Sequence, residues 1–235
     1  MNRGVLAAMA ALTLSGCGAS GSGDASLAFF PSSMSFVSEV AEEAEGLDAP
    51  EFVFAGSARL VAQLEDGADA AVLVTADEET MQRARDHGLV VEDLGIVARN
   101  RLVLAVAPGN PGEIASVDDL DNGSLLLGVC APEVPCGRLA REATETLGIT
   151  ILADTEEANV RSLTVKIDTG ELHGGLIYAT DALAFDLETV DDDTLADFTT
   201  EYPAARVGDG DVGIVDYLHS PAGQAALTGH GFERP

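Results

Sequence analysis

The sequence contains no tryptophan and few basic residues. Only 12 lysines and arginines stand against 40 aspartates and glutamates, which gives a formal net charge of -28. A surface of this sign repels nucleic-acid backbones and anionic membrane surfaces, so both partner classes are excluded over most of the molecule. No stretch approaches the roughly 18 uninterrupted apolar residues that a membrane-spanning helix needs. The 235 residues suffice for one large domain or two small lobes with a packed core.

Motifs for covalent or metal-dependent catalysis are also missing. The chain has no Gly-x-x-x-x-Gly-Lys phosphate loop, no Gly-x-Ser-x-Gly elbow and no His-Glu-x-x-His motif. Its four histidines have spacings that suggest no shared metal ion: His87, His173, His219 and His230. We therefore expect a protein that is not an enzyme and carries no cofactor. The alternative is a lipoprotein enzyme, such as a hydrolase assembled from residues distant in sequence.

The N-terminus reads as an export signal over residues 1–16. Arg3 supplies a short positive region, an apolar run over Val5–Leu14 follows, and the order Leu-Ser-Gly-Cys17 resembles a bacterial lipobox. We expect Cys17 to be lipidated, with the Gly/Ser-rich residues 17–25 as a tether. The alternative is a signal peptide with an incidental cysteine. The expected location is extracytoplasmic, anchored to the cell membrane by lipid.

Two further cysteines remain once Cys17 is assigned to the anchor. Cys130 and Cys136 would share an oxidising compartment, in which such pairs form disulfides. A bridge would close a short loop and stabilise it by about 2 kcal/mol. The alternative is a pair of free buried thiols.

Short apolar runs alternate along the chain with segments of helical periodicity. This alternation is typical of parallel sheets covered by helices, so the predicted fold class is α/β. The pattern predicts lobe I over residues 26–104, lobe II over 105–200, and a return segment with C-terminal helices, mainly in lobe I, over 201–235. The apolar run Arg101–Ala107 is interpreted as the crossing between lobes, with a cleft between them.

The alternation also predicts one further strand and the start of one helix. Residues 150–153 have the apolar character of a strand. The order Thr75-Ala-Asp-Glu78 matches a capping box and predicts a helix that ends at Gly88.

Four helices are expected to begin directly after small-residue turns at the ends of strands. In an open parallel sheet these ends line the ligand crevice. Each helix start presents unpaired N–H groups and a partial positive charge, so several converging starts would hold a dianion without lysine or arginine. Ser33 and Ser57 add hydroxyl donors, unless they are ordinary N-caps. The four turns are Pro31-Ser-Ser-Met34, Ala55-Gly-Ser-Ala58, Val134-Pro-Cys-Gly137 and Ala158-Asn-Val-Arg161.

A series of short motifs carries a family resemblance over residues 27–233. The motifs are Ser32-Ser-Met34, Phe54-Ala-Gly-Ser-Ala-Arg-Leu60, Thr75-Ala-Asp77, Asn100-Arg-Leu-Val-Leu104, Pro132-Glu-Val-Pro-Cys-Gly137, Asn159-Val-Arg161 and Ile177-Tyr-Ala-Thr-Asp181. In this order they resemble periplasmic molybdate-binding proteins of ABC transporters. The sequence departs from the family pattern at Pro31, at Gly56 and Ala58, in the shortened Pro132–Pro135 segment, and at Cys136, where alanine is common.

The resemblance implies a two-lobed, type II periplasmic-binding-protein fold and a set of ligand-binding residues. These are Ser33 and Ser57 through hydroxyl and amide hydrogens, Cys136 and Val160 through backbone N–H groups, and Tyr178 through its hydroxyl. It also implies capture of molybdate or tungstate as the oxyanion, delivery to an ABC permease, and a monomeric protein. The alternative role of Tyr178 is a buried aromatic residue at a strand end whose hydroxyl is satisfied by protein.

Donor chemistry and two neighbouring charged residues complete the expected site. A site made only of donors suits a fully deprotonated oxyanion and disfavours phosphate, which also needs an acceptor. Sulfate or another oxyanion remains the alternative ligand. Arg161 is predicted to pair with one of the acids Glu156, Glu157 and Asp181, and Asp181 is predicted to be structural, as a helix cap.

Overall fold

The computed structural model describes residues 26–235. The predicted export signal, Cys17 and the tether lie outside the described residues. Within residues 26–235, none of the helices has the length and apolar character needed to cross a membrane.

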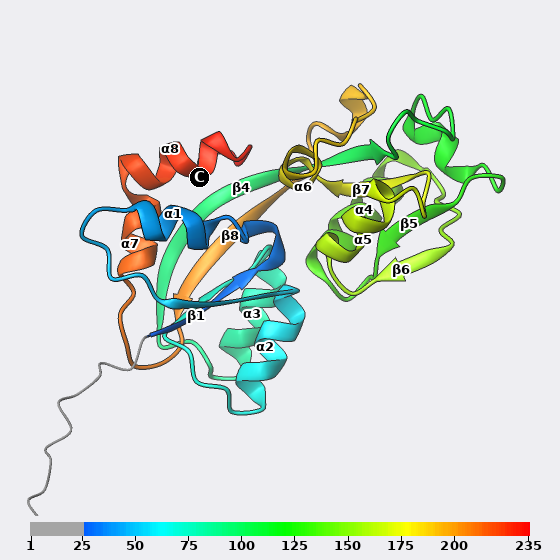
Figure 1. Ribbon diagram of the computed structural model, residues 1–235. Coiled ribbons are helices and arrows are strands. Elements are labelled where there is room, and N and C mark those ends of the chain that lie inside the picture. The colour runs from blue at the N-terminus through cyan, green and yellow to red at the C-terminus, as the bar shows by residue number, and fades with distance from the viewer. Residues whose placement is uncertain (1–25) are drawn as a thin grey trace, which may run out of the picture.

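Lobe I contains a sheet with helices on both faces (Figure 1). Its parallel strands lie in the order β2 (Glu51–Ala55), β1 (Leu27–Pro31) and β3 (Val72–Val74). Side chains alternate between faces along β1, because successive residues of a strand point in opposite directions. Phe29 packs with residues of α2 (Ser57–Glu65) and α3 (Glu78–Asp86). Phe30 packs in the larger core shared with α1 (Val37–Glu43).

The long strand β4 (Glu92–Val106) connects the two lobes. Its first part, up to Arg101, pairs antiparallel with β8 (Thr199–Arg206), and β8 in turn pairs with β3. From Leu102 onward β4 pairs with β7 (Gly174–Tyr178) of the other lobe. One sheet of eight strands results, in the order β2-β1-β3-β8-β4-β7-β5-β6. The strand therefore passes between lobes at the start of the apolar run that suggested a crossing.

Lobe II has a smaller sheet, in which β7 and β6 flank β5 in parallel. Its remaining elements are β5 (Leu127–Cys130), β6 (Thr155–Glu157), α4 (Pro135–Leu147), α5 (Val160–Asp168), α6 (Ala179–Ala184) and the 3₁₀ turns η2 (Val117–Asp121) and η3 (Asp193–Leu195). The prediction of a strand over residues 150–153 was wrong. Ile151 there packs against the core outside any strand. The edge strand that follows is polar, so hydrophobicity does not mark it.

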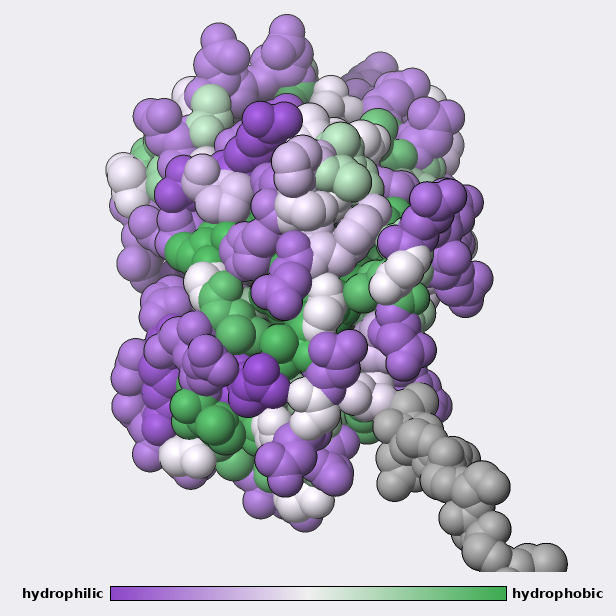
Figure 2. Space-filling model, turned by 90° about the vertical axis from the view of Figure 1, so that its left-hand side faces the viewer, coloured by the Kyte–Doolittle hydropathy of each residue, from purple (hydrophilic) through white to green (hydrophobic). Residues whose placement is uncertain are grey.

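The chain ends in lobe I with α7 (Gly213–His219) and α8 (Pro221–Gly229). Ser220 caps α8 by accepting a hydrogen bond from the Gly223 N–H, and Pro221 occupies the first turn, where a missing N–H costs nothing. Figure 2 shows that the face turned toward the viewer is mostly hydrophilic, with apolar residues gathered across its middle and in a patch near its lower end. This distribution agrees with the acidic composition.

The start of α3 differs from the predicted capping box. Asp77 is the N-cap residue, and its Oδ1 accepts from the Thr80 N–H at 2.9 Å. Thr75 instead donates its hydroxyl hydrogen to the Asp77 carbonyl at 2.7 Å. A carboxylate is a strong cap at this position, so helix α3 begins later than the Thr75–Glu78 pattern indicated.

Candidate functional site

The structure brings all five predicted ligand-binding residues to one small cavity between the lobes. Twelve residues line it, six from each lobe. Lobe I contributes Pro31, Ser32, Ser33, Gly56, Ser57 and Ala76, and lobe II contributes Val134, Pro135, Cys136, Asn159, Val160 and Tyr178. None of these side chains carries a charge.

The cavity is small. It offers about 20 Å³ to the centres of water-sized groups, somewhat more than the ~10–15 Å³ that one water molecule needs. Such a space suits a compact ion of a few atoms. It does not suit an extended organic substrate.

Four element starts meet at this cavity, and three of them lack a side-chain cap. The residues at the N-cap positions of η1 (Ser32–Met34), α2 and α4 are Pro31, Gly56 and Val134, and none makes a capping hydrogen bond. Proline, glycine and valine offer no side-chain acceptor, so the N–H groups of these first turns are not satisfied locally. At the fourth start, Asn159 caps α5 by accepting from the Ser162 N–H.

The first turns leave specific backbone donors at the cavity. The N–H groups of Ser57, Cys136 and Val160 are too near their helix starts for a helical acceptor. Within residues 26–235 no other hydrogen bond satisfies them. Together with the aligned peptide dipoles of α2, α4 and α5, they make the cavity electropositive without a cation.

The two serines are not N-caps. Ser57 is the first residue of α2, and its Oγ accepts from the Ala76 N–H at 3.0 Å. Ser33 lies within η1, and its Oγ is 3.0 Å from the hydroxyl of Tyr202. The alternative reading of both serines as ordinary caps was therefore wrong.

Tyr178 ends β7 at the cavity wall. Its side chain is 1% exposed, and its hydroxyl has no hydrogen-bond partner among the described residues. Burial, with the nearby Tyr202, Asp77 and Asp181, raises its pKa well above the ordinary value. The phenol thus stays neutral and keeps a hydrogen to donate.

Cys130 and Cys136 are joined by a disulfide, with their Cα atoms 5.7 Å apart. The bridge ties the end of β5 to the first turn of α4. A Cβ atom at Gly137 would collide with the Ala131 carbonyl oxygen, so the loop is packed tightly against that turn. Both features restrict the loop that presents the Cys136 N–H, which lowers the entropy lost on binding.

The predicted ion pair of Arg161 was wrong. Its guanidinium lies over the Phe185 ring, 4.3 Å from the centroid, and none of the predicted acids is within ion-pair distance. Glu157 is already paired with Lys166 at 2.8 Å. Stacking on an aromatic face is a favourable alternative for arginine.

Asp181 is not a helix cap. Tyr178 holds the N-cap position of α6, and Asp181 lies inside the helix, 2% exposed, with one carboxyl oxygen lacking a partner in the described chain. Burial raises its pKa to about 7, against a smaller opposing effect of Arg161 and a hydrogen bond from Thr180. The carboxyl in the fold therefore keeps its proton to a higher pH than a free aspartate does.

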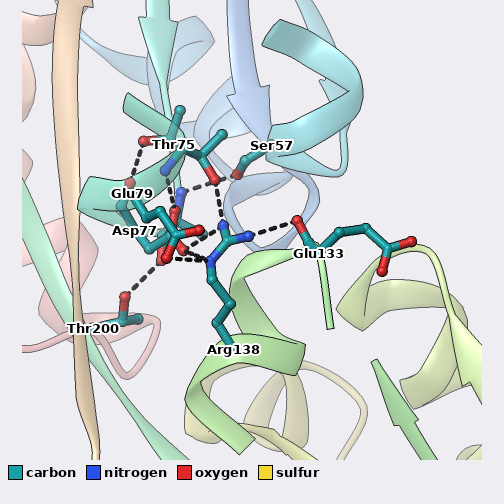
Figure 3. Close-up of polar contacts among 9 residues, drawn as sticks. Ser57, Thr75, Asp77, Glu79, Glu133, Arg138 and Thr200 are labelled. Atoms are coloured by element: carbon teal, nitrogen blue, oxygen red, sulfur yellow. Dashed lines mark hydrogen bonds and ion pairs between the residues drawn. The ribbon is translucent and has the colours of Figure 1, made fainter. Parts of the chain in front are cut away.

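An ion pair that the sequence did not suggest joins the lobes beside the cavity. Arg138 of α4 reaches Asp77 at the start of α3, with its Nε 2.8 Å and its Nη2 2.6 Å from Asp77 Oδ2 (Figure 3). It also donates to Thr80 Oγ1 and to the Glu133 carbonyl, both at 2.6 Å. Sequence reasoning missed this contact because the partners are 61 residues apart and follow no motif with a known pairing.

Glycine at position 56 permits a second close contact between lobes. A Cβ atom there would lie 2.9 Å from the Ala158 carbonyl oxygen and 3.2 Å from the Asn159 Cβ. The backbone angles of Gly56 (φ -62, ψ 137) are accessible to any residue. Space across the cleft, not backbone conformation, therefore favours glycine here.

The fold and the site define a class of two-lobed α/β binding proteins. In this class strands cross between the lobes, and a small solute binds at the junction of the lobes. The chain belongs to the bacterial extracellular solute-binding protein family, whose model matches residues 36–233. This is a family of binding proteins and not of enzymes. The match and the relatives below confirm the predicted resemblance.

Two relatives and two solved structures illustrate the similarity. The molybdate-binding protein ModA of Mycobacterium tuberculosis is 38% identical over 133 residues, covering 57% of this chain and 51% of that protein, so the match spans about half the relative's length. ModA of Haemophilus influenzae is 30% identical over 203 residues, covering 77% of each.

The two structures confirm the predicted type II fold. The Azotobacter vinelandii periplasmic molybdate-binding protein has a TM-score of 0.71 at 16% identity, covering 89% of this chain and 99% of that one. The M. tuberculosis sulfate-binding protein SubI has a TM-score of 0.72 at 16% identity, covering 89% and 86%.

Proposed function

We propose that this protein captures molybdate or tungstate outside the cytoplasm and delivers it to an ABC importer. The observation that carries the proposal is the cavity itself, where neutral donors from both lobes converge and no charged side chain takes part. The names of the molybdate-binding relatives support the same ligand.

The unpartnered hydroxyl of Tyr178 is the strongest local sign of a ligand. A buried hydroxyl without a hydrogen bond costs about 1–3 kcal/mol. A bound oxyanion would supply the missing acceptor to Tyr178 and also to the N–H groups of Ser57, Cys136 and Val160. Binding of the anion would thereby offset the cost of burying these donors.

Neutral donors explain how a chain with a net charge of -28 can bind an anion. The acids lie mostly on the surface, where water and salt screen them over about 10 Å. Inside the cleft, N–H and O–H dipoles act at hydrogen-bond distance in a medium of low dielectric constant. The local dipoles therefore outweigh the distant charges.

The remaining parts of the proposal concern partners. We infer that the two lobes, held around the anion, form the surface that a membrane permease recognises. The protein acts as a monomer, lipid at Cys17 retains it at the membrane, and capture needs no cofactor. Intact mass of protein extracted from membranes tests the anchor, because acyl chains add a defined mass to a chain that begins at Cys17.

Calorimetric titration of the purified protein with molybdate, tungstate, sulfate and phosphate tests the ligand. We expect tight one-to-one binding of molybdate and tungstate, weaker binding of sulfate, and the weakest binding of phosphate. Tighter binding of sulfate would instead indicate a sulfate receptor. No binding of any oxyanion, together with turnover of an ester or phosphoester, would indicate an enzyme and contradict the proposal.

A further inference from the structure

Hydrogen bonds link Asn100 to Tyr202 and Tyr202 to Ser33, and the structure determines which group donates in each. They start at Asn100, which is 0% exposed on β4. The Arg101 N–H, which can only donate, lies 2.9 Å from the Asn100 side-chain oxygen. This contact fixes which end of the amide is oxygen and which is nitrogen.

The amide nitrogen of Asn100 then uses both of its hydrogens. It donates to Thr180 Oγ1 at 2.7 Å and to the Tyr202 hydroxyl oxygen at 3.2 Å. Thr180 and Tyr202 are buried as well, so water does not compete for these bonds. The Tyr202 oxygen is thereby an acceptor toward Asn100.

The hydrogen of the Tyr202 hydroxyl must go elsewhere. The only other partner within the described part of the chain is Ser33 Oγ, at 3.0 Å. A buried hydroxyl hydrogen left without an acceptor is costly, so Tyr202 donates and Ser33 accepts. The hydroxyl hydrogen of Ser33, which lines the cavity, is left for the ligand.

The hydroxyl oxygen of Ser57 also accepts a hydrogen bond from the protein, for an independent reason. Its Oγ accepts from the Ala76 N–H, which can only donate. Thr200 Oγ1 donates to the Ala76 carbonyl at 2.7 Å and holds that peptide in place. Both serines thus accept a hydrogen bond from the protein and turn their own hydrogens toward the cavity.

We propose that Asn100 and Tyr202 are positioning residues that fix Ser33 as a donor and make the site reject oxyanions that carry a proton. This inference rests on the proposed oxyanion-binding function and deepens it. A hydroxyl that is free to rotate can accept a hydrogen from hydrogen phosphate. One that already accepts from Tyr202 is committed to donating, and a protonated oxygen placed against it has no acceptor.

Tyr202→Phe tests the proposal, because it removes one oxygen and keeps the ring that packs edge-on against Phe232 and Tyr178. We expect molybdate affinity to fall by up to about tenfold, the factor of one neutral hydrogen bond, because Ser33 still donates to the anion but loses the contact that holds its hydroxyl in place. We expect the ratio of molybdate to phosphate affinity to fall as well, because Ser33 can then accept. Tyr217→Phe on α7 is the matched control and should leave both values unchanged, because Tyr217 does not line the cavity.

A double-mutant cycle with Ser33→Ala separates positioning from general destabilisation. If Tyr202 acts through Ser33, Tyr202→Phe has no further effect on anion selectivity once Ser33 is alanine. Additive effects would overturn the proposal. So would an unchanged molybdate-to-phosphate ratio in a folded Tyr202→Phe protein that still binds molybdate.

Asn100→Asp provides a second variant if Tyr202→Phe does not fold. A carboxylate at position 100 accepts from the phenol, so Tyr202 turns away from Ser33, and the same loss of discrimination is expected. Unchanged discrimination in this variant contradicts the proposal equally. A wild-type protein that binds no oxyanion would instead contradict the proposed function itself.

Discussion

The ion pair between Arg138 and Asp77 makes a sharp prediction about lobe closure. Asp77 uses its two oxygens separately: Oδ1 caps α3, and Oδ2 accepts from Arg138. Asparagine is as good an N-cap as aspartate. Asp77→Asn therefore keeps the helix start and removes the charged acceptor nearest to Arg138, while the longer contact of Arg138 Nε with Glu79 Oε2 at 3.5 Å remains.

The size of the effect follows from burial and geometry. Both side chains are 15% exposed, and two guanidinium nitrogens approach one oxygen within 2.8 Å. Hydrogen bonds to charged groups contribute about 1.5–3 kcal/mol. Because this pair spans the cleft, it stabilises only the state in which the lobes meet. Its loss should weaken anion affinity by roughly 10- to 150-fold when the free protein is open.

Calorimetry and stopped-flow kinetics of molybdate binding check this expectation. The dissociation rate should rise much more than the association rate falls, because the pair forms after the anion enters. Glu65→Gln is the control, since Glu65 pairs with Arg83 within lobe I at 2.7 Å, and it should change affinity less than about twofold. Equal affinities of Asp77→Asn and the wild type would refute the idea that this pair holds the lobes together.

Three further changes test other parts of the site. Ser57→Ala should reduce molybdate affinity by about 1–3 kcal/mol in calorimetry through loss of one donor; unchanged affinity would remove Ser57 from the site. Gly56→Ala should weaken binding about tenfold or more, because its Cβ would lie 2.9 Å from the Ala158 carbonyl oxygen across the cleft, while the melting temperature of the free protein stays unchanged; unaltered affinity would show that the lobes need not approach so closely. Asp181→Asn should raise the melting temperature at pH 8 and change it little at pH 4. The pKa of Asp181 is about 7 in the fold against 3.8 for a free aspartate, so the folded state holds a proton that the unfolded chain releases, and the cost of the carboxylate grows as pH rises through this window. A gain that is equal at both pH values would contradict the shifted pKa.

The sequence predicted much of the fold because its signals are local. Glycine at position 148 ends α4 in a left-handed conformation, and Ser220 with Pro221 starts α8, as their side chains and backbone preferences require. Predicting these helix ends needs only a few neighbouring residues. The rule that parallel strands end at the same edge of a sheet brings the starts of α4 and α5, with Cys136 and Val160, together within lobe II. Their meeting with Ser57 of lobe I depends in addition on how the two lobes face each other.

The contacts across the cleft could not be predicted in the same way. Arg138 and Asp77 come from different lobes, and their pairing depends on how those lobes pack. The sequence shows an arginine among many acids, and each acid is an equally plausible partner. Arg161 illustrates the same limit, because it pairs with none of the three acids expected from the sequence and stacks on Phe185.

The direction of the hydrogen bonds in this site says more about which ligands would fit than the types of its residues do. A serine by itself can donate or accept, so two serines in a cavity say little about the protonation state of a ligand. Backbone N–H groups cannot reverse their role, and two of them, from Ala76 and Arg101, determine the direction for Ser57 and, through Asn100 and Tyr202, for Ser33. A chain of fixed donors thus extends from the backbone of the sheet into the cavity. Under the proposed function, this chain of donors would give the site a preference for a deprotonated anion through Asn100 and Tyr202, which do not line the cavity.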